Sequence, residues 1–295
     1  MPDANPTRKT LPDDQDPADR STPTSSATTQ PIRLARSKQV WTRAGSAAGF
    51  VLRYLPPMRR LLIDMVDDDG RADQAMAILI QHLVKTGYGE HDQHRLRDFL
   101  IRGIRSAAKV QATQANAKWV AEQKERWQES EAQGEPFIQQ PEPQWPIHLE
   151  LAATDSTQWI DYWRDGLLQR AWRALERQQH AIQFRLQSGT TEPDGNSTMH
   201  TDADGGDLVH DVLHVSMAHA GESTQVLAGR LASSAGRTIN DRNLQQQLHE
   251  ARILFAQFLA DEVASTLDDP SPATVRSEIQ TLRLHHAFSD VTVLE

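Results

Sequence analysis

The chain has 295 residues, of which 38% are hydrophobic and none is cysteine, and its formal net charge is −9. Without cysteine it has no disulfide, no thiolate zinc site and no thiol nucleophile. It has no apolar N-terminal segment and no run of about eighteen apolar residues, so we expect a cytoplasmic protein without a membrane partner. The length suits two domains.

The acidic charge is unevenly distributed along the chain. Residues 38–127 carry fifteen Lys and Arg against ten Asp and Glu, whereas residues 128–158 carry six acidic residues and no basic one. Residues 223–260 have a net charge of +2, and the segments on either side of them are acidic. The segments with helical periodicity are thus mildly basic. This distribution permits nucleic-acid binding without proving it, since a basic helix face is more often simply solvated.

The N-terminal half reads as a tail followed by three helices. Residues 1–37, rich in Pro, Ser, Thr and Asp, are expected to be disordered. Apolar residues at helical spacing begin near Trp41. Pro56-Pro57 are expected either to break this helix or to start a new one. "DDDG" (67–70) predicts a turn that caps a second helix over 71–87. A long third helix is predicted over 94–127. Its basic side is formed by Arg95, Arg97, Arg102, Arg105 and Lys109.

The C-terminal half begins after an acidic, Gln- and Pro-rich linker over residues 128–158. A helix is predicted behind Asp155-Ser156, with Trp159 and Trp163 among its buried candidates. An acidic loop over 188–206 and a short helix follow. We therefore predict an all-α fold of two helical modules joined by a flexible linker. The modules are 38–127 and 159–267, followed by a C-terminal helical tail over 268–295.

Residues 224–263 have the pattern of a helix-turn-helix. A short helix, a turn at Gly236 and a longer amphipathic helix from Asn240 follow one another. In such a motif only the N-terminal half of the second helix enters the major groove, where Arg and Gln make bidentate contacts to bases. The candidate DNA-binding side chains are Arg242, Gln245, Gln246, His249 and, for phosphate, Arg252. The alternative is an ordinary solvated helix face, because similar patterns are common in all-α proteins.

In the stretches "HRLRDFLIRGI" and "GRTINDRNLQQQLHEAR", and in three others that accompany them, the chain resembles sigma factors of the extracytoplasmic-function type. "RADQAMAILIQHLV" and "HRLRDFLIRGI" are similar to the first conserved region of that family. "WIDYWRDGLLQRAWRALERQ", "GRTINDRNLQQQLHEAR" and "DDPSPATVRSEIQTL" are similar to the second region, in the variant multiplied in planctomycete bacteria. The resemblance covers roughly residues 40–127 and 159–287, in the family's order.

This resemblance implies a transcription initiation factor. Its first module would bind core RNA polymerase and help to open the promoter, and its second would read double-stranded promoter DNA through the helix-turn-helix. By position, Asp73 falls in the family's polymerase-contacting acidic stretch, and Arg95 and Arg97 fall in its basic stretch. The other basic side chains of the same helix, Arg102, Arg105 and Lys109, are expected to contact DNA with them.

Several departures from the family pattern leave a second interpretation open. Met76 stands where the family carries glutamine, Gln245 and Glu250 stand where arginine is usual, and an acidic loop lengthens the second module. These differences favour a diverged helical regulatory or protein-interaction adaptor that lacks promoter-directing activity. A regulatory protein is a further partner that either interpretation leaves open.

No pattern of an enzyme is present. His210 and His214 have the spacing of two metal ligands on a helix, but the sequence offers no third ligand. "HDQH" (91–94) lacks the distant partners that a hydrolase metal site needs. The sequence also lacks a Gly-rich phosphate loop and a nucleophile elbow. We therefore expect no enzymatic activity, metal, cofactor or small-molecule substrate.

Overall fold

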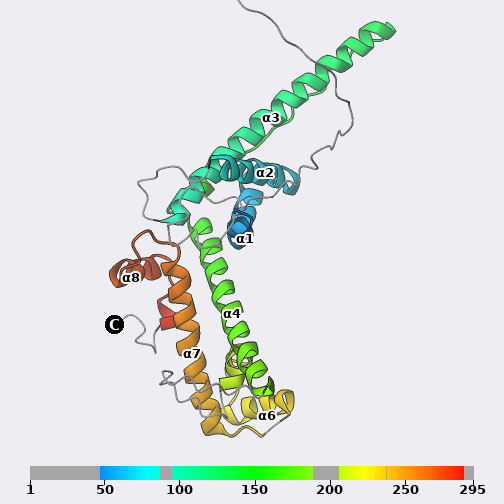
Figure 1. Ribbon diagram of the computed structural model, residues 1–295. Helices are drawn as coiled ribbons and strands as arrows, with labels where there is room; N and C mark the ends of the chain where they lie inside the picture. Colours follow the sequence, from blue (N-terminus) through cyan, green and yellow to red (C-terminus); the bar gives the residue numbers. More distant parts are fainter. Residues whose placement is uncertain (1–46, 87–94, 189–205, 237, 289–295) are drawn as a thin grey trace, which may run out of the picture. The chain divides into compact units, whose positions relative to one another are not determined.

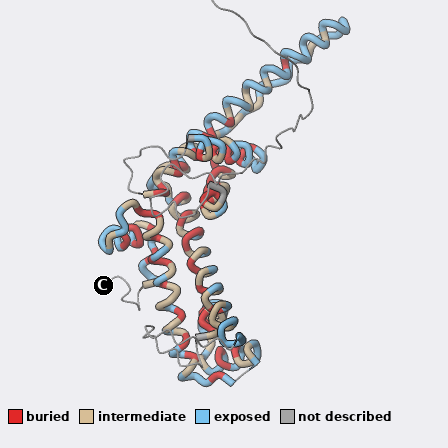
Figure 2. Tube along the Cα trace, viewed as in Figure 1, coloured by how far each residue is buried: buried red, intermediate tan, exposed pale blue. Residues whose placement is uncertain are grey.

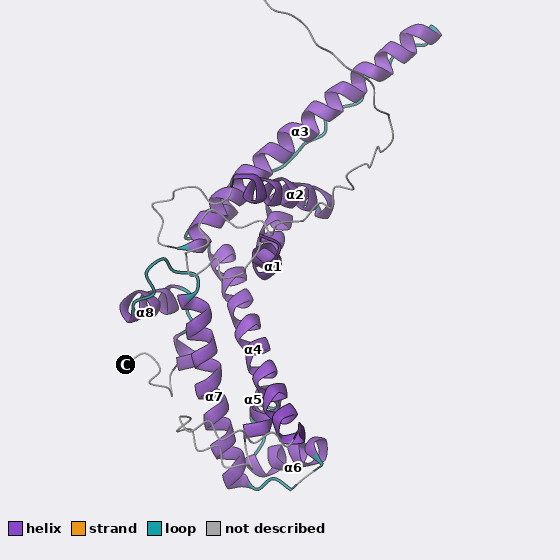
Figure 3. Cartoon of the chain, viewed as in Figure 1, coloured by secondary structure: helices purple, strands orange, loops and turns teal. Residues whose placement is uncertain are grey.

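The structure is a computed structural model that describes residues 47–86, 95–188, 206–236 and 238–288. In this part of the chain there are eight α-helices and no strand, which confirms the all-α prediction (Figure 3). The predicted disordered tail, "HDQH", nearly all of the acidic loop and residues 289–295 of the C-terminal tail lie outside the described residues.

Figure 1 shows the order of the helices, and the described parts of their connections contain three 3₁₀ turns. The α-helices are α1 (Ala47–Val66), α2 (Asp69–Thr86), α3 (Leu96–Gln133), α4 (Thr157–Ser188), α5 (Val209–Ala218), α6 (Thr224–Ala235), α7 (Asp241–Ala264) and α8 (Pro272–Thr281). The 3₁₀ turns are η2 (Leu149–Ala152), η3 (Gly206–Leu208) and η4 (His285–Phe288). None of the helices among the described residues is both long and apolar enough to span a membrane.

The prolines of α1 neither break a helix nor start one, so both expectations for them are wrong. Pro56 and Pro57 lie inside α1, which continues to Val66. A proline within a helix leaves the carbonyl four residues earlier without its N–H partner. For Pro57 that carbonyl belongs to Arg53, and it accepts a hydrogen bond of 3.2 Å from Nη1 of Arg170 on α4. A side chain from a distant helix thus replaces the lost backbone donor.

The predicted linker is partly helical and partly packed. α3 extends to Gln133 and ends at Gly134, whose left-handed φ of 68° favours glycine. Farther along, the backbone N–H of His148 donates to the carbonyl of Met65 at 2.8 Å. Arg71 contacts the same segment through the carbonyl of Pro146. Residues 146–152 are therefore fixed against α1 and α2, which the composition of the segment did not indicate.

One hydrophobic core contains buried residues from both predicted modules. Figure 2 marks the buried residues in red along the helices. Trp159 and Trp163 of α4 are almost fully buried, as predicted, but they pack against Phe50 and Tyr54 of α1. The rings of Tyr54 and Trp163 stack with centroids 5.4 Å apart and planes inclined by 10°. The same core includes residues of α7 and α8. The predicted boundary between the modules therefore does not divide the core.

A cluster of charged side chains joins α1, α4 and α7 next to these rings. The carboxylate of Glu262 accepts hydrogen bonds from Arg53 at 2.6 Å and from Arg170 at 2.7 Å. Both guanidinium groups also lie over the ring of Tyr54. Each arginine contacts a different oxygen of this carboxylate through one charge-assisted hydrogen bond, which is stronger than a hydrogen bond between neutral groups. These contacts fix the C-terminal end of α7 to α1 and α4.

Candidate nucleic-acid interface

The predicted helix-turn-helix is present, formed by α6, a short turn and α7. Leu227 and Leu231 of α6 pack with Ile239 of the turn and Leu244 of α7 in a small hydrophobic core. α5 closes this core through Val212, among others. α4 and α7 lie side by side, as Figure 1 shows, so α7 is supported along its length.

The turn and the start of α7 have the local chemistry that the sequence predicted. Gly236 ends α6 with a φ of 65°, a conformation that residues with a Cβ rarely adopt. Asn240 is the N-cap of α7, and its side-chain oxygen accepts from the backbone N–H of Asn243 at 2.8 Å. This cap holds the first turn of α7, which is the part of the helix that would enter a groove.

We predict that Asn240→Ala lowers the free energy of unfolding by about 1 kcal/mol, the usual cost of losing an N-cap. The same change should fray the first turn of α7 and weaken any DNA binding through it. Chemical denaturation followed by circular dichroism measures the first effect. Asn240→Asp, which retains a capping oxygen, should stay near the wild type; an equal loss in both variants would contradict the capping role.

The five candidate reading residues lie together on the exposed side of α7. They are Arg242, Gln245, Gln246, His249 and Arg252, all of which are exposed. At about 100° per residue these positions share one face of the helix. The neighbouring Gln247 is instead buried among the packed helices. On the apolar side of the same helix, Leu244, Ala251, Leu259 and Val263 are buried, whereas Leu248, Phe255 and Phe258 are half-buried.

The charge on this face is mixed. Arg242 and Arg252 supply positive charge, whereas Asp241 and Glu250 lie beside them. The Nε2 of Gln246 donates to Oε1 of Glu250 at 3.1 Å, so one reading amide has an intrahelical partner. Because this hydrogen bond is exposed to solvent, the Gln246 amide can exchange it for a hydrogen bond to a base. The face can offer hydrogen bonds to base edges, with fewer cations than a surface that binds DNA by charge alone.

Gln179 is a buried residue whose role was not predicted from the sequence. Its side chain positions α5 beneath the helix-turn-helix. Gln179 of α4 accepts from the backbone N–H groups of His210 and Asp211 and donates to the Asp211 carboxylate at 2.7 Å. It thus caps the N-terminus of α5 from another helix. The contact joins residues about thirty positions apart, and a glutamine within a helix carries no local signal for this role.

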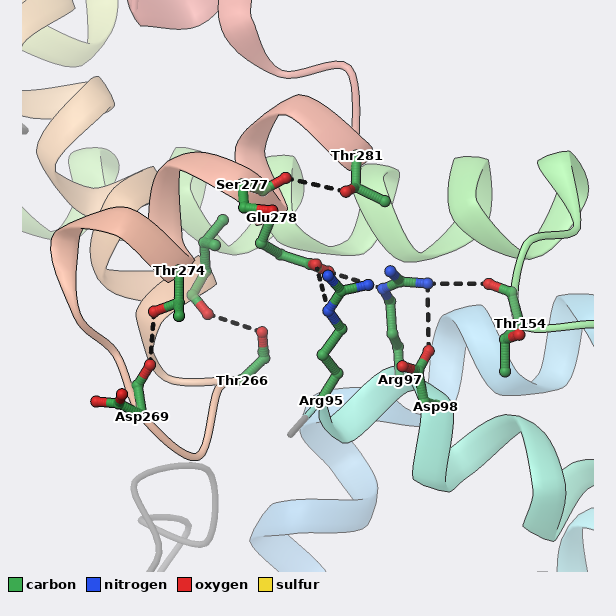
Figure 4. Close-up of polar contacts among 11 residues, drawn as sticks. Arg95, Arg97, Asp98, Thr154, Thr266, Asp269, Thr274, Ser277, Glu278 and Thr281 are labelled. Atoms are coloured by element: carbon green, nitrogen blue, oxygen red, sulfur yellow. Dashed lines mark hydrogen bonds and ion pairs between the residues drawn. The ribbon is translucent and has the colours of Figure 1, made fainter. Parts of the chain in front are cut away.

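The basic side of α3 is exposed only in part. Arg102, Arg105 and Lys109 are exposed, so their predicted contact with DNA stays a prediction. Arg97, in contrast, is only 3% exposed, and its Nε donates to Oε1 of Glu278 at 2.7 Å (Figure 4). The Nε of Arg95 lies 3.1 Å from Oε2 of the same carboxylate.

Arg97 therefore does not fit its predicted role in DNA binding. Its Nη1 also donates to the carbonyl of Thr154 at 3.0 Å, so the guanidinium has partners on three sides. Glu278, on α8, is 1% exposed. A carboxylate and a guanidinium buried together stabilise each other only because they are paired. Arg97 serves as a structural link between α3 and α8, and the half-buried Arg95 shares that carboxylate.

The remaining predicted residues occupy separate places. Asp73, predicted to contact polymerase, is exposed on α2, where a hydrogen bond from Arg59 at 2.7 Å lowers the pKa of its carboxyl. His210 and His214 stack on each other beside Trp172. Within the described part of the chain, no group of three or more His, Cys, Asp or Glu could hold a metal ion.

A comparison of the chain with family models, curated proteins and solved structures finds no match.

Proposed function

We propose that this chain binds duplex promoter DNA through its helix-turn-helix and acts as a sigma-like transcription initiation factor. The observation that carries the proposal is the arrangement of α7. Its N-terminal half is capped, supported from behind by α5 and α6, and free of apolar side chains on the side that carries Arg242, Gln245 and His249. A supported helix with long hydrogen-bonding side chains at its N-terminal end is what major-groove reading requires.

If α7 reads DNA, substitutions on it should cause two different kinds of loss, one of sequence discrimination and one of overall DNA affinity. Arg242→Ala and Gln245→Ala should each reduce discrimination between a preferred and an unrelated duplex, because each bidentate base contact is worth about 1–3 kcal/mol. Arg252→Ala should weaken binding to both duplexes alike and reduce the salt slope by about one, as expected for a phosphate contact. The preferred duplex is first selected from a random pool with the wild-type protein.

The matched control for these variants is Gln257→Ala, an exposed position in the C-terminal half of α7. It should leave both affinity and discrimination unchanged, and all variants should retain the wild-type helical content. If Arg242→Ala and Gln245→Ala bind the selected duplex as the wild type does, α7 does not read DNA.

The polymerase part of the proposal rests on the sequence resemblance and on the exposure of Asp73. A tagged protein should recover the large subunits of core RNA polymerase from a lysate of its host. Asp73→Arg should reduce that recovery, while Asp155→Arg, at another exposed acidic position, should not. Full recovery with Asp73→Arg would remove Asp73 from the proposed contact.

A second candidate function is a helical adaptor without promoter activity. The burial of Arg97 and the shared core favour it, because both remove features that the sigma resemblance implies. If the chain is such an adaptor, selection from the random pool should yield no preferred duplex. Core RNA polymerase should also be absent from the material that the tagged protein recovers from the lysate. A protein interface dominated by apolar contacts would also respond weakly to salt, whereas DNA binding through several phosphates weakens steeply.

A further inference from the structure

The C-terminal half of α3 leaves an apolar stripe uncovered. α3 has 38 residues, and its buried residues lie between Leu96 and Gln111 apart from Gln123 (Figure 2). On another side of the helix, Val110, Val120 and Trp127 are 39%, 52% and 48% exposed, and Ala117 between them is exposed as well. We call these four residues the α3 stripe. Large exposed apolar groups that line up on one face are typical of an interaction surface.

The segment that returns along α3 leaves the stripe open. After Gly134 the chain passes Gln123, whose Oε1 accepts from the backbone N–H of Gln140 at 3.4 Å. It then reaches Trp145, over which the guanidinium of Arg71 lies. At about 100° per residue, Gln123 is separated from the middle of the stripe by about a quarter turn. The returning segment covers the neighbouring side of α3 and not the stripe itself.

The spacing of the stripe suits a helix of the same sequence running in the opposite direction. The intervals from Val110 to Ala117, to Val120 and to Trp127 are seven, three and seven residues. These are the intervals of a two-helix seam. They also read the same from either end. A second α3 in antiparallel orientation therefore places Val110 opposite Trp127 and Ala117 opposite Val120.

The exposed charges of α3 differ between its N-terminal half and its C-terminal end. The N-terminal half carries Arg102, Arg105 and Lys109, whereas the C-terminal end carries Glu129 and Glu131 and has no basic residue in its last turn. In an antiparallel pair, the basic stretch of each copy meets the acidic end of the other, which adds cross-chain attraction. The acidic last turn of α3 also opposes the helix macrodipole, so cations from a partner there are favourable.

We propose that two copies of this chain associate through antiparallel pairing of α3 along the stripe. With Val110 opposite Trp127, Glu131 of one copy faces the turn between Arg102 and Lys109 of the other. Lys124 faces Thr113, so no like charge opposes it. The interface is isologous, as in most homodimers. It covers Arg102 and Lys109, which leaves α7 as the DNA-reading surface of each copy.

The test is the molecular mass in solution, with no DNA present, so its result is independent of the proposed function. The wild-type chain of 33.1 kDa should sediment with twice that mass at micromolar concentration. Val120→Glu places a charge at the centre of the seam and should weaken association by about tenfold or more. The matched control is Glu122→Lys, an exposed position that lies at least about 120° around the helix from every residue of the stripe. It should leave the dimer intact.

A charge exchange tests the orientation. Glu131→Arg alone should weaken the dimer, and Arg102→Glu combined with Glu131→Arg should restore it, because the pair then forms with reversed signs. A monomeric wild type at about 100 µM, or a dimer that Val120→Glu leaves intact in a folded protein, overturns the proposal. A dimer weakened by Val120→Glu and not restored by the exchange overturns the antiparallel arrangement.

Discussion

Replacement of Glu278 by glutamine is expected to lower the free energy of unfolding by about 3–5 kcal/mol. Glu278 and Arg97 are 1% and 3% exposed, and their side chains are joined at 2.7 Å. Removal of the carboxylate charge leaves the guanidinium of Arg97 buried with its other carboxylate contact, to Asp98, at the longer distance of 3.3 Å. Burial already raises the pKa of Asp98, so this carboxyl is a poor substitute.

Urea denaturation followed by circular dichroism measures this loss. Glu125→Gln, an exposed position on α3, is the matched control and should change stability by less than about 0.5 kcal/mol. The double variant Arg97→Met/Glu278→Met removes both charges and should recover much of the stability, since an apolar pair of similar size often replaces a buried ion pair without loss. Equal stability of Glu278→Gln and the control would show that the pair is not formed in solution.

Trp163→Ala should destabilise the chain by about 3–5 kcal/mol, the usual cost of emptying a buried tryptophan site. The ring lies between the two predicted modules, stacked on Tyr54 of α1 and in contact with Trp159 of α4. Because one core contains all three residues, the helices that contribute to this core should unfold in one cooperative transition. The variant should shift the whole transition to lower denaturant concentration.

Two controls separate this effect from a general sensitivity of α4. Phe184→Ala removes an aromatic ring from the same helix where it is 71% exposed, and it should have a small effect. Trp163→Phe should cost less than Trp163→Ala, since the indole N–H has no hydrogen-bond partner among the described residues and the ring face is retained. Two separate transitions, only one of which moves in Trp163→Ala, would contradict the shared core.

Much of the helical organisation was predictable because its causes are local. The amphipathic pattern after Asn240 predicted a helix with one buried side, which contains Leu244, Ala251 and Leu259, and Asn240 predicted its start. Ser271 followed by Pro272 is an equally local signal for the start of α8, where the Ser271 hydroxyl accepts from the N–H of Thr274. In these cases the side chain and the backbone group that it serves lie within one helical turn.

The candidate interface was predictable to the same extent. The reading residues of α7 follow from the period of that helix alone, and all five are exposed as expected. Arg97 was wrongly grouped with the exposed cations because a basic residue at a helix start is usually solvated. Its partner lies 181 positions away, and nothing in either local sequence indicates the pairing.

The sequence by itself determined the all-α class, the helix-turn-helix and the face that α7 presents, because helix period and end caps act over three or four residues. Only the tertiary structure decided that Trp163 packs on α1, that Arg170 supplies a donor to the carbonyl of Arg53 and that Glu278 covers Arg97. Each of these contacts joins residues more than a hundred positions apart. Such pairs are selected by shape and by compensation of buried charge, and neither is visible in the spacing of residues along one helix.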